Sequence, residues 1–105
     1  MMHLTMADKS LLIGDAEAEL LVEYAALIAR VGSGDHVRMN ALSPQGEAVV
    51  VDVLLNAGTV LLVETTHSEF PDPDNSEAIA VMGSRMAAYD VSVDFATDNP
   101  FGTED

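Results

Sequence analysis

Three apolar runs separated by two turn sequences lie within residues 37–66, which read VRMNAL SPQG EAVVVDVLL NAG TVLLVETT. Runs rich in Val and Leu and bounded by Pro, Gly and Asn predict β-strands joined by tight turns. We therefore expect strands over 37–42, 47–55 and 59–66, paired as an antiparallel meander. The two later strands are apolar on both faces near their centres, whereas a sheet with one wet face shows cleaner alternation. The second face then needs a further element, a ligand or another subunit, and this pattern is our main argument for a homodimer.

The residues before this stretch predict a hairpin and a helix. Alternating residues over 3–6, a turn at Asp8–Lys9 and an apolar return over 11–13 predict a short β-hairpin over 3–13. Apolar residues at helical spacing then predict a helix over 15–31. Asp15 stands where an N-cap is expected, and Gly32 is expected to end the helix.

The residues after this stretch predict a second helix, over 75–89, that follows a proline-containing loop. Asp74 and Glu77 have the spacing of a capping box at its start. Alternation over 91–95 predicts a short last strand, and residues 97–105 are expected to form a flexible acidic tail.

These elements follow in the order β-β-α-β-β-β-α, with the short last strand at the end. The simplest architecture is an α+β two-layer sandwich, in which one antiparallel sheet carries both helices on one face. The length fits one domain, which we place at residues 1–96.

Charge limits the classes of partner. The chain of 105 residues has 18 acidic residues against 4 Lys and Arg, a formal net charge of −14. Direct binding to nucleic acid or to an anionic membrane depends on basic residues, so we expect neither. The acidity fits solubility, adaptation to a salty interior, or a surface that meets a basic partner or mimics nucleic acid.

The chain has no cysteine, which excludes disulfides, thiolate metal ligands and cysteine nucleophiles. The start, Met1–Met6, lacks the regions of a signal peptide, and no apolar run approaches the ~20 residues that span a bilayer. We expect a cytoplasmic protein without a cofactor.

An acidic stripe marks one face of the first predicted helix. Asp15, Glu19 and Glu23 recur every four residues there, which places their side chains together. The stripe is either a solvated face or the contact surface for a basic protein partner.

Asp52 is a carboxylate within an otherwise apolar strand. It is either an exposed strand position or, if buried, the partner of Arg38, because the hairpin over Pro44–Gln45 pairs these two regions. With His36 nearby, these residues are the candidate lining of a ligand pocket.

Two groups of residues are candidate metal ligands. Asp72 and Asp74, followed by Ser76, copy the first odd positions of a calcium loop, although Glu77 replaces its glycine and helix capping explains the same spacing. His36 and His67, each near carboxylates, could ligate zinc only if the fold brought them together.

The opening hairpin at His3–Met6, the helix, the strand led by Gly34–Asp35, the meander and the closing helix resemble a group of small, uncharacterised actinobacterial domains over residues 2–88. Some of those domains are labelled as DNA-ligase-like. The nucleophilic lysine of ligases is followed by x-Asp-Gly, whereas Lys9 is followed by Ser10–Leu12. The resemblance therefore implies a fold and no activity.

No catalytic constellation stands out among these patterns. We therefore expect a non-catalytic acidic protein-interaction or regulatory domain. The alternative is a small-ligand-binding domain or a small enzyme, with a pocket near Asp52, Arg38 and His36.

Overall fold

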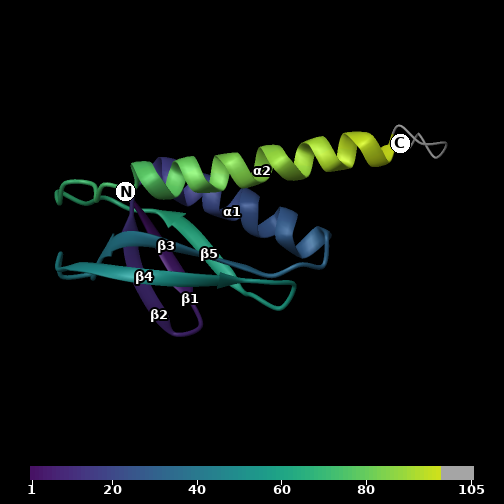
Figure 1. Ribbon diagram of the computed structural model, residues 1–105. Coiled ribbons are helices and arrows are strands. Elements are labelled where there is room, and N and C mark those ends of the chain that lie inside the picture. Colours follow the sequence, from purple (N-terminus) through teal and green to yellow (C-terminus); the bar gives the residue numbers. More distant parts are fainter. Residues whose placement is uncertain (98–105) are drawn as a thin grey trace.

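Two helices cover one face of a five-stranded antiparallel sheet in the computed structural model, which describes residues 1–97 (Figure 1). The strands are β1 (Met2–Met6), β2 (Lys9–Ile13), β3 (Asp35–Leu42), β4 (Ala48–Leu55) and β5 (Leu61–Thr65), and the helices are α1 (Asp15–Arg30) and α2 (Ser76–Thr97). The α+β class, the antiparallel sheet and the order of these seven elements are those that the sequence predicts.

The strands lie in the order β4-β3-β2-β1-β5, so the predicted meander is wrong in its last step. β4 follows β3 as a hairpin, but β5 leaves β4 and pairs with β1 on the far side of the sheet. This register places Leu4 opposite Val63 and Met6 opposite Leu61, so apolar side chains of both strands meet on the inner face.

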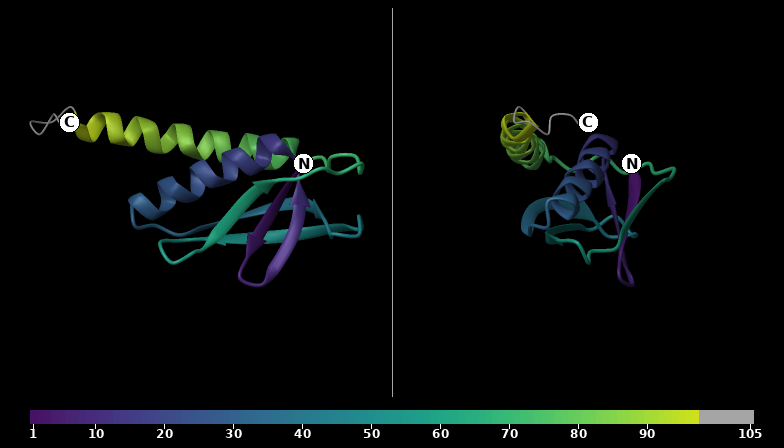
Figure 2. Two further views of the ribbon diagram at one scale, coloured as in Figure 1. Left: turned by 180° about the vertical axis from the view of Figure 1, so that it is seen from behind. Right: turned by 90° about the vertical axis from the view of Figure 1, so that its right-hand side faces the viewer.

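The sheet curves around α1, which lies in its concave face, while α2 packs beside α1 (Figure 2). Side chains from the strands and both helices form one core. Its largest fully buried members are Tyr24, Leu4, Ile13, Leu21, Ile28, Leu55 and Met82. Each large apolar side chain buried in this way contributes about 1.5–3 kcal/mol.

The ends of α1 differ from the predicted ones by one residue. Gly14, not Asp15, is the N-cap of α1, and the Asp15 carboxylate instead lies 3.0 Å from the N-terminal amine. The Gly14 N–H donates to the Glu17 carboxylate at 2.8 Å, which is one half of a capping box, and a Cβ at Gly14 would lie 2.8 Å from that carboxylate. At the other end, Gly32 has a φ of +67°, as expected of a residue that ends a helix.

The strand predicted over 91–95 is helical, because α2 continues to Thr97. Five alternating residues are a weak signal, and neither glycine nor proline stands between Ser84 and Thr97 to end the helix. The predicted tail, 97–105, overlaps α2 at its first residue and otherwise lies outside the described residues. Among the described helices, none is long and apolar enough to cross a membrane.

Candidate functional site

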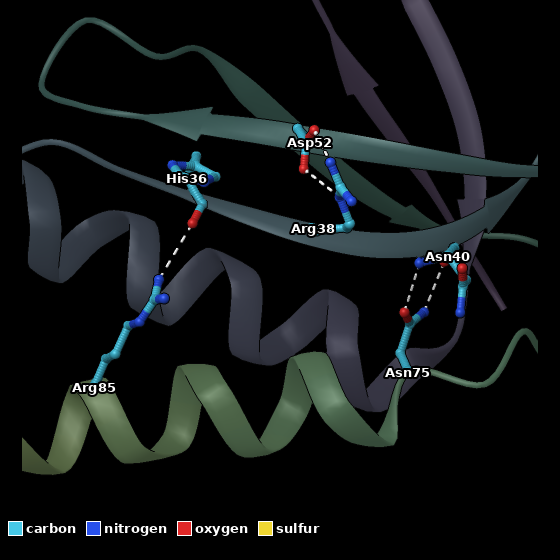
Figure 3. A network of polar contacts seen from close by, with 6 residues as sticks. All are labelled: His36, Arg38, Asn40, Asp52, Asn75 and Arg85. Carbon is cyan, nitrogen blue, oxygen red and sulfur yellow. Dashed lines mark hydrogen bonds and ion pairs between the residues drawn. The ribbon is translucent and has the colours of Figure 1, made fainter.

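A cavity of about 610 Å³ lies where α2 passes the edge of β3. His36, Arg38 and Asp52, which the sequence marks as a ligand pocket, all line it. Asn75 and Arg85 approach it from the side of α2 (Figure 3), and Val81 of α2 also lines it. The structure thus brings two sequence-distant groups to one site.

Arg38 and Asp52 form a two-pronged ion pair across β3 and β4. The Arg38 Nε and Nη2 atoms donate to the two carboxylate oxygens of Asp52 at 3.0 and 3.1 Å. These hydrogen bonds lower the pKa of Asp52 and raise that of Arg38. Both side chains are exposed, so Asp52 is an exposed strand position and also the partner of Arg38. An exposed pair of this kind adds little to the stability of the fold, and both side chains are accessible to a ligand.

Asn75 joins the start of α2 to the edge of β3. Its Oδ1 accepts from the Asn40 N–H at 2.7 Å, and its Nδ2 donates to the Asn40 C=O at 2.7 Å (Figure 3). The same Nδ2 donates to Glu17 at 2.8 Å. Asn75 and Glu17 are each only 5% exposed, so these bonds hold a buried polar junction between β3, α1 and α2.

Arg85 borders the other end of the cavity. Its Nη1 donates to Asp35 at 2.7 Å and to the C=O of His36 at 3.2 Å. Asp35 also accepts from the buried Tyr24 hydroxyl and from the His36 N–H. Burial opposes ionisation of Asp35, but the Tyr24, His36 and Arg85 interactions outweigh it and lower the pKa of this carboxyl.

The acidic stripe stays apart from the cavity. Asp15, Glu19 and Glu23 are exposed on α1, and none of them lines the cavity. Asp15 bonds to the N-terminal amine and raises the pKa of that amine. Among residues 1–97, Glu19 and Glu23 are the two carboxylates of this stripe that form no ion pair.

The candidate metal ligands do not converge. Within residues 1–97, no group of three or more His, Cys, Asp and Glu side chains could hold a metal ion. The Asp74 carboxylate instead accepts from the Ser76 N–H at 3.0 Å and from the Ser76 hydroxyl at 2.9 Å. The predicted capping box is wrong by one position, because the first hydrogen bond of α2 runs from Ile79 to the C=O of Asn75.

The second face of the predicted sheet is partly uncovered along β4. Val50 is 64% exposed and Leu54 is 61% exposed, both on the face away from the helices. β4 is also an edge strand, and its sequence AVVVDVLL contains one charged residue, Asp52. Natural edge strands commonly carry lysine, proline or inward charges that block pairing, and β4 carries neither lysine nor proline.

No protein-family model, curated protein or solved structure matches this chain. What the cavity and the β4 edge can do therefore follows from their own geometry. The cavity offers two guanidinium groups, three carboxylates, an imidazole and an open strand edge within one groove.

Three polar residues that line the cavity, Asn40, Asn75 and Arg85, were not predicted from the sequence. Asn40 alternates like any strand residue, and Asn75 looks like an ordinary helix cap in a polar loop. Arg85 stands alone on its helix, and its contact with Asp35 spans 50 residues. A scarcity of basic residues is the one signal that could have singled out Arg85, because such a chain has few cations for its many carboxylates.

Proposed function

We propose that this chain is a protein-interaction domain that pairs with a second copy of itself along β4. The observation that carries the proposal is the open, apolar edge of β4 with exposed Val50 and Leu54. A strand edge of this kind is a template for another strand.

The alternation of hydrogen bonds supports a self-complementary register. The N–H and C=O of Asn40 bond to Asn75, so Asn40 and the opposite residue Val50 are a pair without hydrogen bonds between them. The N–H and C=O of Val50 therefore point to the free edge of β4. The same holds for every second residue of β4. Antiparallel pairing about Val51 then sets Val50 against Asp52 of the second copy and keeps the two Asp52 carboxylates from facing each other.

The dependence on salt concentration distinguishes this dimer from a contact made by the acidic stripe. Two copies that each carry a net charge of −14 repel one another, so added salt should strengthen the dimer. A basic protein bound through Glu19 and Glu23 should instead dissociate as salt rises. We propose that stripe as the contact for a basic partner, which salt-dependent release would support.

The test is sedimentation velocity of the full chain over a range of concentrations and salt. We expect a dimer whose fraction rises with salt and is lost in Leu54→Lys, because an outward lysine on an edge strand opposes pairing. The matched control is Val22→Lys, an exposed valine on α1 that should leave the dimer intact. A monomer at all salt concentrations, or equal effects of both variants, would contradict the proposal.

A second candidate function is ligand binding at the cavity, favoured by its volume of about 610 Å³ and by the convergence of His36, Arg38 and Asp52 on it. Asp52→Asn removes one charge of the exposed ion pair and leaves the core untouched. A ligand that contacts this pair should bind Asp52→Asn with altered affinity, and unchanged binding would count against the site.

A further inference from the structure

The edge of β3 that faces α2 has one gap in its hydrogen bonds. Every second residue of β3 points its backbone N–H and C=O toward this edge. Leu42 pairs there with Leu12 of β2, the backbone of Asn40 bonds to Asn75, and the His36 C=O accepts from Arg85. Arg38 lies between them, and within the described part of the chain no hydrogen bond reaches its N–H or C=O.

We propose that the groove between β3 and α2 binds the amino-terminal end of an extended peptide, whose second residue pairs antiparallel with the backbone of Arg38. The proposal rests on the second candidate function, ligand binding at this cavity. An extended peptide offers the C=O and N–H that complement the two open groups of Arg38, as in other cases of strand addition.

The charges at the two ends of the groove set the direction of the peptide. Asp74 and Glu77 border the end near Asn40, and the Arg85 guanidinium borders the end near His36. An antiparallel peptide runs from the Asn40 end to the His36 end, so its positive amino group lies beside the carboxylates. A parallel peptide would place its carboxylate there and would be repelled.

The two ends of the groove also differ in how far they are closed. Asn75 is buried and fixed by hydrogen bonds to Asn40 and Glu17, so it closes one end of the groove. The Arg85 side chain is 44% exposed, so the bound peptide can leave the groove past this residue. The four residue steps from Asn40 to His36 span about 13 Å, which holds three to four residues in extended form.

The walls indicate which side chains fit. Residues of an extended peptide alternate between two faces. The second residue of the peptide shares a face with Arg38 and lies near the Arg38–Asp52 pair, which favours a polar side chain. The first and third residues turn toward Ala78 and Val81 of α2, which favours small apolar side chains.

The first test uses a pool of tetrapeptide amides of mixed sequence with free amino groups, and the same pool after acetylation. Each pool is mixed with the full chain, separated by gel filtration, and the retained peptides are identified by mass spectrometry. We expect peptides from the free-amine pool to be retained at least about tenfold more than their acetylated forms, a difference of about 1.4 kcal/mol. Retention of neither pool, or equal retention of both, would overturn the proposal.

The second test uses the best retained peptide and variants of α2. Val81→Lys places a long charged side chain in the groove and should abolish binding, whereas Ala80→Lys on the exposed side should not. Methylation of the backbone nitrogen of the second peptide residue removes a donor and should weaken binding about tenfold. Binding that survives either the Val81→Lys change or the methylation would place the peptide elsewhere and overturn the proposal.

Chemical shift changes in NMR spectra of the unaltered chain locate the peptide independently of variant folding. We expect the largest shifts at the amides of Arg38 and Val81, and shifts confined to β4 would overturn the groove assignment. The outcome is separable from the dimer, because Leu54→Lys changes a residue that does not line this cavity. Peptide binding by a monomeric Leu54→Lys chain would uphold the groove irrespective of the dimer.

Discussion

The carboxamide of Asn75 bonds both the N–H and the C=O of Asn40, so a single side chain stands where a neighbouring strand would otherwise pair with β3. β2 ends at Ile13, where the chain turns into α1, so β2 does not reach the backbone groups of Asn40. The Asn75 side chain bonds to these groups instead. The same amide reaches Glu17, which links the strand edge to the first turn of α1.

Asn75→Ala should destabilise the fold by about 2–4 kcal/mol, because it removes one of the two hydrogen bonds of the buried Glu17 carboxylate and leaves the N–H and C=O of Asn40 without partners. The measurement is urea unfolding followed by circular dichroism. Asn56→Ala is the matched control, since Asn56 also bonds to backbone but is exposed, and it should cost less than about 1 kcal/mol. Equal unfolding midpoints for the two variants would show that the junction contributes nothing special.

Tyr24 should make stability fall at alkaline pH. Burial and the hydrogen bond to Asp35 raise the pKa of Tyr24 from 10.0 to about 12. The folded chain then holds this proton more tightly than the unfolded chain. The contribution of Tyr24 to the free energy of unfolding is therefore complete below pH 10.0 and is lost as the pH rises to about 12.

Tyr24→Phe should lower stability by about 1 kcal/mol at neutral pH and should remove the alkaline loss that depends on this phenol. Unfolding free energies measured on both sides of pH 10.0 test this expectation. Tyr89→Phe, which changes the other of the 2 tyrosines, should keep the alkaline loss. Identical slopes in wild type and Tyr24→Phe would contradict the role of Tyr24.

Gly46→Ala should destabilise the β3–β4 hairpin. Gly46 has a φ of +93°, and a Cβ there would lie 2.6 Å from the ring of Phe70. The left-handed backbone alone costs a residue with a Cβ about 1–2 kcal/mol. Thermal unfolding should show a lower midpoint, and an unchanged midpoint would mean that the turn and Phe70 rearrange freely.

Gly83→Ala should have the opposite effect. Gly83 lies inside α2, and apart from the neighbouring residues and backbone of its own helix a Cβ there would meet nothing within 4 Å. Alanine in an open helix position is favoured over glycine by about 0.5–1 kcal/mol. A rise in the unfolding midpoint is expected, and a fall would indicate a contact at Gly83 that the structure does not contain.

Local patterns were enough to predict the two hairpins, α1 and the start of α2, because alternation and helical spacing are properties of neighbouring residues. They were not enough to place β5, since apolar alternation identifies the face of a strand and not its neighbour. Leu61 and Val63 fit β1 as well as they fit β4 by pattern alone. The last predicted strand failed for the related reason that a short alternating run also fits a helix.

Part of the candidate site could likewise be predicted from local sequence patterns, and part could not. Arg38 was named as the partner of Asp52 only for the case in which Asp52 is buried, because the hairpin over Pro44–Gln45 pairs these two regions. The two side chains pair although both are exposed. Asn75 and Arg85 reach the cavity only through the packing of α2 on β3, which no spacing in the sequence encodes. The open backbone of Arg38 is likewise visible only once the end of β2 is known.

The placement of β1 between β2 and β5 has a consequence for the chain during synthesis. β1 and β2 leave the ribosome first, but the outer edge of β1 has no partner until Leu61–Thr65 follows. Pairings between distant segments form slowly, and unpaired edges in unfinished chains are prone to aggregate. Translation products that stop within β4 should therefore collect in the insoluble fraction, whereas products that extend through β5 should not.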